Sequence, residues 1–251
     1  MTAQRISAIY LLRQTLATAG SLYDSLLIIN SPHLIWFLLN IFGRYAMLNT
    51  LEITRSELDS ASVPLNIIYW LVAAPFLSGA TNFYTYRSLT KNQVTVSDAF
   101  SQAKRRLLPL IFVNFLSVVL LLAWAGIIVW LGRSFAFVGL MIIIPGLYLF
   151  SHLIFPSYAT VIDNSSVLES FNRSWELTEG RWWLVFRSNL LISFVFFVPA
   201  VLLSELIGST LGNLLASQVV GNVLGFIAGL LMNIYLVLLY QRLRESAAAT
   251  Q

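Results

Sequence analysis

The sequence predicts an all-α integral membrane protein, a bundle of six transmembrane helices with amphipathic helices at the membrane interface. Three observations lead to this fold class. Of the 251 residues, 58% are hydrophobic and only 10% are charged, whereas a soluble domain carries about 25% charged residues. Six apolar segments approach the ~20 residues that a helix needs to cross a bilayer. Lys and Arg are concentrated in alternate connections between those segments.

The six expected spans form a single domain that covers residues 1–251. A backbone inside lipid must satisfy its own hydrogen bonds, so each span is expected to be helical. The third span is the most uniformly apolar, and the first is the weakest because it contains Pro32 and His33. The segments are 26–47, 64–85, 107–131, 135–162, 183–206 and 218–240.

The basic residues predict the orientation in the membrane. With six spans, twelve of the 15 Lys and Arg residues lie on the side that holds both termini. Basic residues favour the cytoplasmic side of a membrane. We therefore expect cytoplasmic termini in the plasma (inner) membrane of a bacterium, or in an internal membrane where the organism has one.

A charged, tryptophan-rich stretch at 164–183 interrupts the apolar segments. Ser166 followed by Glu169 is the capping-box pattern of a helix start, and Gly180 is typical of a helix end. Between them apolar residues that include Trp175 recur at helical spacing. An amphipathic helix with tryptophan on its apolar side is typical of the membrane interface.

The capping pattern occurs more than once. The sequence TVSDAF at 95–100 matches SVLESF at 166–171 position by position, and SLYDSL at 21–26 is a fainter copy. The near-equal spacing favours an internal repeat, one interfacial helix followed by two spans, over chance similarity among capped helices.

Small residues predict close helix packing at the end of the chain. Gly221, Gly225 and Gly229 form a doubled GxxxG on one face of the sixth span, and such faces let helices approach closely in lipid. The contact is either a dimer face or an internal one, and a six-helix protein favours the internal contact. A weaker analogue in the second span comprises Ala74, Ser78 and Asn82.

His152 is the strongest candidate for a functional residue inside the membrane, because an ionisable residue at that depth is a functional candidate by default. In one continuous helix it shares a face with Pro145 and Pro156. The alternative is a neutral histidine bonded to a carbonyl that a proline has freed. Asn114 and Asn189 complete the candidate polar site, and they would hydrogen-bond between helices.

The sequence contains none of the signatures GxSxG, HExxH, GxGxxG or the phosphate-binding P-loop. It has no cysteine, and its two histidines are far apart. We therefore expect a protein that is not an enzyme, with no catalytic residues, no metal, no cofactor and no nucleic-acid partner.

The stretch from Ile142 to Leu191 resembles a large group of bacterial polytopic membrane proteins. The group includes the membrane domain of some glycerophosphoryl diester phosphodiesterases and stand-alone relatives of unknown function. The resemblance implies six spans and no catalytic residues, because the phosphodiesterase activity belongs to a separate soluble barrel domain. Ser170 stands where alanine is usual. The matching residues are Pro145 and Gly146 of an IPG run, and Arg173, Ser174, Trp175, Gly180 and Trp183 of an interfacial motif.

The leading functional hypothesis is an organising or accessory component of a bacterial membrane. It would act on the lipid bilayer, on a membrane-protein partner or on a second copy of the chain. Lys104, Arg105 and Arg106 would form a lipid-facing basic cluster against anionic headgroups. The alternative for this cluster is that it only determines topology.

The alternative function is a transporter or permease component for a small or lipid-like solute. The repeats, the proline-interrupted fourth span and His152 favour it, while the parallel repeats and the sparse polar residues count against it. A cavity at mid-membrane bordered by His152 and asparagine side chains would favour transport, and a filled bundle would favour scaffolding.

Overall fold

The computed structural model describes residues 7–50, 55–90, 93–134, 136–212 and 214–249, and its secondary structure over these ranges is entirely helical. The elements are α1 (Ala8–Thr50), α2 (Arg55–Ile68), the π-helical segment η1 (Tyr69–Ala73), α3 (Ala74–Leu89), α4 (Val96–Arg105), α5 (Leu107–Ser134), α6 (Ala136–His152), α7 (Pro156–Ile162), α8 (Val167–Thr178), α9 (Trp182–Leu211) and α10 (Leu214–Ala248).

Among the described residues, five helical segments are long and apolar enough to cross a membrane. Their length and composition confirm the predicted class, an all-helical protein with helices suited to multiple membrane crossings. The segments are Ala8–Met47, Ser62–Leu89, Leu107–Leu131, Trp182–Thr210 and Leu215–Ala248.

The expected span 135–162 is not one continuous helix. α6 has 17 residues and ends at His152, and the chain turns before α7 begins at Pro156. Proline suits the first position of a helix, because the amide it lacks has no partner there. Pro156 therefore starts a new helix, and the expected single helical face with Pro145 and His152 is wrong.

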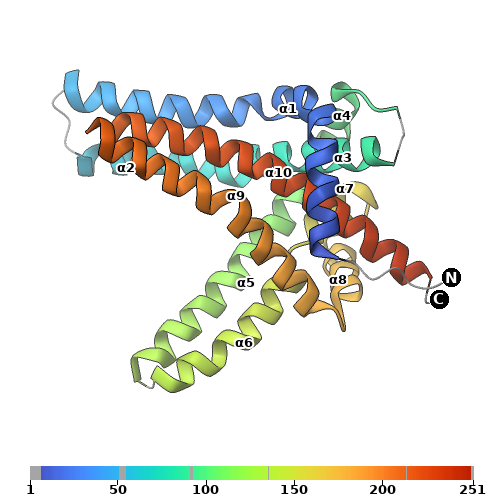
Figure 1. Cartoon of the computed structure of the whole chain (residues 1–251). Helices are drawn as coiled ribbons and strands as arrows, with labels where there is room; N and C mark the ends of the chain where they lie inside the picture. The colour runs from blue at the N-terminus through green and yellow to red at the C-terminus, as the bar shows by residue number, and fades with distance from the viewer. Residues whose placement is uncertain (1–6, 51–54, 91–92, 135, 213, 250–251) are drawn as a thin grey trace.

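Figure 1 shows how the elements are arranged. The start of α1 and the end of α10 lie at the same end of the molecule as the short helices α4, α7 and α8. α2, α3, α9, α10 and most of α1 run away from that end as one group, while the α5–α6 hairpin diverges from this group (Figure 1).

α1 is bent, and its first part runs across the other helices before the remainder lies along α10 (Figure 1). The hydroxyl groups of Thr15, Thr18 and Ser21 donate to carbonyl oxygens three or four residues earlier. Hydrogen bonds of this kind, from a side chain to the backbone of the preceding turn, often bend a helix. These residues also surround Gly20, which favours bending further.

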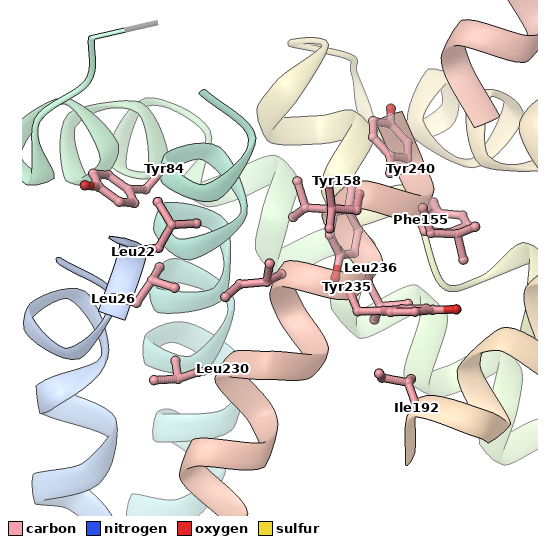
Figure 2. Packing of buried hydrophobic residues seen from close by; sticks show 14 of the residues in the cluster. Leu22, Leu26, Tyr84, Phe155, Tyr158, Ile192, Leu230, Tyr235, Leu236 and Tyr240 are labelled. Carbon is pink, nitrogen blue, oxygen red and sulfur yellow. The ribbon is translucent and has the colours of Figure 1, made fainter. Parts of the chain in front are cut away.

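α10 is the central helix of the group. All seven residues of the run Ile234–Tyr240 are buried, and a helix that is apolar and buried on every side belongs in the core. Figure 2 shows Tyr240 beside Phe155 and Tyr158, which come from the start of α7. The ring centroids of Phe155 and Tyr240 are 5.5 Å apart.

Two of the three capping patterns start helices as predicted. Thr95 and Asp98 form a reciprocal capping box at the start of α4, and the amide of Ser166 donates to Glu169 Oε2 at 2.8 Å at the start of α8. The cap expected at Ser21 is absent, since residues 21–26 lie inside α1. The hydroxyl of Ser21 instead donates to the carbonyl of Thr18.

Both capping carboxylates, Asp98 and Glu169, have a lowered pKa. The backbone amides of Thr95 and Ser166, followed by their side chains, lower the pKa of Asp98 and of Glu169 respectively. Hydrogen bonds to the ionised form cause these shifts.

Candidate functional site

His152 lies at the end of α6 against α8. Its Nδ1 shares a hydrogen bond with Thr178 Oγ1, and its ring stacks on Trp175 with centroids 3.9 Å apart and an interplanar angle of 12°. Ser174 Oγ donates to the His152 carbonyl. The side chain is buried, and its Nε2 has no hydrogen-bond partner within the described ranges. The histidine therefore joins α6 to α8, and its ring bonds a threonine hydroxyl rather than a carbonyl that a proline has freed.

Asn114 and Asn189 do not form a site with His152. Asn114 Nδ2 donates to the Leu110 carbonyl of its own helix at 2.8 Å, and Asn189 is buried in α9. Where side chains are described, no hydrogen bond or ring contact joins either asparagine to His152. The three candidates are separate because they belong to different helices. The helical period shows which residues share a face of one helix, but it does not show which faces of two helices meet.

The interfacial motif ends as predicted. Gly180 has a φ of +67°, in the left-handed region that glycine tolerates just after a helix. Ser174 and Trp175 hold His152, while Trp183 is exposed and its ring packs on Phe186 with centroids 5.6 Å apart.

A carboxylate that the sequence did not single out joins α7 to α8 and α10. Asp163 Oδ2 accepts from the Tyr240 hydroxyl at 2.6 Å, and Asp163 Oδ1 lies 3.1 Å from Arg244 Nη2. Arg173 Nε lies 3.9 Å from Asp163 Oδ2. Arg173 also pairs with Glu176 at 3.3 Å. We call Asp163, Arg173, Tyr240 and Arg244 the Asp163 cluster.

The three residues of the basic cluster have different surroundings. Lys104 and Arg105 are exposed at the end of α4, next to the exposed Leu108. Arg106 is half-buried, and its Nε donates to Asn164 Oδ1 at 3.1 Å. Asn164 also accepts from Gln102 Nε2 at 2.7 Å. Arg106 therefore links the α4–α5 corner to the turn after α7.

A cavity of about 470 Å³ lies between α1, the η1–α3 segment, α9 and α10. Most of its lining residues lie near the middle of the helical segments that could cross a membrane. They are Asn30, His33, Phe37, Trp70, Ala74, Leu77, Ser78, Thr81, Phe197, Gly221, Asn222, Gly225, Phe226, Gly229, Leu230 and Asn233.

Polar side chains connect the helices around this cavity. Asn30 Nδ2 donates to Thr81 Oγ1 at 2.9 Å, which joins α1 to α3. Asn233 Nδ2 donates to Asn82 Oδ1, and Thr85 Oγ1 donates to Asn233 Oδ1 at 3.3 Å, which joins α10 to α3. Amide groups at this depth need such partners, because lipid offers none.

Aromatic residues surround the cavity near η1. His33 Nδ1 shares a hydrogen bond with the Tyr69 hydroxyl, and Tyr69 stacks on Trp36 with centroids 4.6 Å apart. The His33 ring meets Phe37 edge-on at 4.5 Å. Tyr69 is the first residue of the π-helical turn, and Trp70, the second, lines the cavity. Such turns occur often at functional sites.

The glycines of the doubled GxxxG have two different roles. A Cβ on Gly221 would lie 3.2 Å from Ser204 Cβ, so this position packs α10 against α9. A Cβ on Gly225 or Gly229 would meet nothing within 4 Å, and both residues line the cavity. Within the described chain, Gly221 therefore makes the expected internal contact while Gly225 and Gly229 do not, and a dimer face at those two positions stays a prediction. The closest approach of α9 and α10 among the glycines is at Gly208, where a Cβ would lie 2.6 Å from Ser217 Cβ.

The sequence did contain a signal for the cavity. Asn30 and His33 share a face of α1, and Ser78 and Thr81 share a face of α3. Polar or small residues three or four apart on otherwise apolar helices mark one face of each. What they could not show is that these faces point into one space.

The side chains around the cavity offer hydrogen bonds and no site for a metal ion. Over the described ranges, no group of three or more His, Asp and Glu residues could hold a metal. The arrangement is suited to holding an uncharged polar group against apolar and aromatic walls.

No curated protein matches this chain, and no solved structure matches it. Residues 18–243, which include every residue of the cavity, match the family described as a domain of unknown function, DUF7847. Since the match spans most of the sequence, the chain belongs to the DUF7847 family.

Proposed function

We propose that the protein binds a small, lipid-like solute inside the membrane and acts as a transporter or permease component for it. The observation that carries the proposal is the cavity of about 470 Å³ bordered by polar side chains of α1, α3 and α10. Ligand sites typically enclose about 300–1,000 Å³. The space would otherwise hold roughly 15 water molecules at ~30 Å³ each.

The depth of the cavity supports an intramembrane ligand. Asn30, Ala74, Phe197 and Gly229 each line it from near the middle of an apolar helical segment. A soluble ligand would have to leave water for this depth, whereas a lipid-like one reaches it from the bilayer itself. The bent α1 and the π-helical turn provide irregular backbone beside the cavity, as helices that bind solutes in transporters often do.

The proposal includes six crossings, cytoplasmic termini and a plasma membrane of bacterial type. With 17 residues at ~1.5 Å each, α6 is about 25 Å long. This is slightly below the ~30 Å hydrocarbon core, a mismatch that local thinning of the bilayer accommodates. The first part of α1, the short helices and the end of α10 lie at one end (Figure 1). These elements carry Arg13, Lys104, Arg105, Arg173, Arg242 and Arg244.

Three repeated units also belong to the proposal. α4 precedes the α5–α6 hairpin, α8 precedes the α9–α10 hairpin, and the first part of α1 precedes the remainder of α1 and α2–α3 (Figure 1). α4 and α8 start with equivalent capping residues. The proposed kinship with the membrane domain of glycerophosphoryl diester phosphodiesterases depends on the IPG run, the interfacial motif and the six-span layout.

The second candidate is an organising or accessory component that acts on lipid or on a protein partner. The exposed Lys104 and Arg105 beside the exposed Leu108 favour it, because cations next to apolar side chains suit an anionic membrane surface. Such a role would not depend on the cavity, so variants that fill the cavity separate the two functions.

Native mass spectrometry of the purified full chain tests the proposal. After incubation with a total membrane lipid extract, we expect one retained lipid-like molecule per chain at energies that remove surface lipid. Gly225→Leu and Gly229→Leu place a side chain in the cavity and should abolish retention. Gly126→Leu is the matched control, because Gly126 is exposed on α5 with no atom within 4 Å of its Cβ position.

The retained compound is then followed in proteoliposomes, where its exit should require the protein and fail in Gly229→Leu. A wild-type chain that retains nothing, or retention that survives both cavity variants, would contradict the proposal. The milder Gly225→Ala, which adds a methyl group without a clash, should fold normally and reduce retention only partly.

A further inference from the structure

We infer that the solute is an uncharged lipid whose head carries hydroxyl or carbonyl oxygen, such as an acylglycerol. This inference rests on the proposed function and specifies its ligand class. It follows from three properties of the cavity: the charge of its lining, the hydrogen-bonding groups that remain free, and the shape of its walls.

The described lining carries no permanent charge. None of the 16 described residues that border the cavity is Lys, Arg, Asp or Glu, and the imidazole of His33 is the one titratable group among them. A phosphate or ammonium group would lose its hydration there without gaining a counter-charge, and burial of an unpaired ion is very unfavourable. The lining therefore selects against charged headgroups of either sign.

Several polar atoms of the lining are already committed to the protein. Thr81 Oγ1 donates to the Leu77 carbonyl, and Asn30 Nδ2 bonds both Thr81 and the Leu26 carbonyl. Both ends of the Asn233 amide are bonded to α3. These groups hold the helices around the cavity and are not the main contacts for a ligand.

Other polar atoms of the lining keep unused capacity. Within the described ranges, His33 bonds Tyr69 through Nδ1 and has no hydrogen bond at Nε2. Asn222 donates from Nδ2 to the Gln218 carbonyl and has no hydrogen bond at Oδ1. Ser78 Oγ donates to the Pro75 carbonyl and can still accept. A head with hydroxyl groups, which both donate and accept, matches this set.

The remaining walls suit a hydrocarbon chain. Gly225 and Gly229 add no side chains to the α10 wall, and Phe37, Trp70 and Phe226 provide flat apolar surface. Apolar contact of this kind stabilises a bound chain in proportion to its buried area. A ligand with a small polar head and an apolar tail would therefore occupy both parts of the cavity.

Photocrosslinking with three matched lipids tests the ligand class. The probes share one diazirine-bearing acyl chain and differ in the head: a glycerol ester, the same ester phosphorylated, and a primary amine. Each is added to the full chain in nanodiscs of zwitterionic phosphatidylcholine, whose charged headgroups the cavity should not accept, and adducts are mapped by peptide mass spectrometry. We expect adducts on the cavity peptides from the glycerol ester to exceed those from either charged probe by about tenfold or more.

The variants separate the two ways in which this experiment could fail. Adducts of the glycerol ester should disappear in Gly229→Leu and persist in Gly126→Leu. Equal labelling of the cavity by a charged probe, lost in Gly229→Leu, would overturn the ligand class while leaving the proposed function intact. If a probe labels the cavity peptides equally in the wild type and in Gly229→Leu, both the ligand class and the proposed function would be overturned.

Ser78→Ala and Asn222→Leu provide a second measurement, since among the described residues neither side chain makes a hydrogen bond to another helix. Loss of these polar groups should lower glycerol-ester labelling several-fold with no gain for the charged probes. Unchanged labelling in both variants would contradict the assignment of the head to this part of the lining.

Discussion

Replacement of Asp163 by asparagine should destabilise the protein, because this carboxylate bonds two other elements at once. Asp163 is the capping residue at the end of α7, and its side chain is 15% exposed. It accepts from Tyr240 at 2.6 Å and faces Arg244 at 3.1 Å. Asparagine would keep the size of the side chain. However, its amide nitrogen is a hydrogen-bond donor, and it would face the Tyr240 hydroxyl or the Arg244 guanidinium, which are donors too.

The expected magnitude follows from these contacts. A hydrogen bond to a charged group contributes about 1.5–3 kcal/mol, and breaking a fully buried ion pair costs about 3–5 kcal/mol. The side chains of Arg173 and Arg244 are 35% and 31% exposed, so water partly hydrates the charges left behind. Arg244 also keeps its bond to the Tyr86 hydroxyl. We therefore expect Asp163→Asn to cost about 2 kcal/mol.

The measurement is the apparent melting temperature in one mild detergent at one heating rate. For a chain of this size about 2 kcal/mol corresponds to a decrease of roughly 4–8 °C. Tyr240→Phe should cost about 1–2 kcal/mol, and the double variant should show a coupling energy of about 1 kcal/mol. Glu176→Gln is the control, since Glu176 is 64% exposed and its pair with Arg173 contributes only a few tenths of a kcal/mol.

Two results would refute this reasoning. If Asp163→Asn melts within about 1 °C of Glu176→Gln, the Asp163 cluster does not hold α7 to α10. If the Asp163→Asn and Tyr240→Phe effects simply add, their hydrogen bond contributes no stability, and the two residues act on separate parts of the fold.

Two further predictions concern the close approach of α9 to α10 and the helix caps. Gly208→Ala should lower the free energy of unfolding by about 1–3 kcal/mol, because its Cβ would clash with Ser217, and Ser217→Gly should restore the stability. Gly225→Ala, where a Cβ meets no atom, should cost almost nothing. Equal melting temperatures of the two alanine variants would show that Gly208 is not a packing position. Because hydrogen bonds lower the folded pKa of Glu169, its capping contribution is present above the unfolded pKa and decreases as pH falls through the folded pKa. Amide exchange in α8, corrected for intrinsic pH dependence, should therefore accelerate at low pH in the wild type. In Glu169→Gln this pH dependence should vanish, and its persistence there would assign it to another group.

Much of the fold follows from local chemistry, which the sequence contains directly. Hydropathy places most of the apolar helices, the exception being 135–162, which the structure divides into α6 and α7. The pairs Thr95–Asp98 and Ser166–Glu169 place two helix starts to the residue. The third capping pattern failed because Ser21 has an equally short-range alternative, the Thr18 carbonyl of a helix already under way. A capping pattern marks the start of a helix only where the residues before it are not already helical.

The candidate site depended on contacts between distant segments, which a single sequence does not specify. His152 was singled out for its depth, yet its partners Thr178 and Trp175 come from the helix expected at the interface. His33 was noted only as a weakness of the first span, although its bond to Tyr69 and its place in the cavity depend on the pairing of α1 with η1. In both cases the residue type was informative, and the identity of the facing helix was missing.

The glycines of α10 show why a small-residue pattern is ambiguous inside a membrane. Gly221 faces Ser204 on α9, so the small side chains there allow contact. Gly225 and Gly229 face no side chain within reach of a Cβ, so the same pattern leaves space. Protein interiors are packed as densely as organic crystals, and a gap forfeits the attraction between the atoms that border it.

The cavity of about 470 Å³ is partly open, and we propose that a bound molecule supplies the packing that its walls lack. Water alone would fit poorly, because large apolar surfaces such as those of Phe197 and Phe226 form much of the wall. A hydrocarbon chain alone would leave His33 Nε2 without a hydrogen bond. The proposed uncharged amphiphile would satisfy both parts of the lining, and it would fill the space that Gly225 and Gly229 leave.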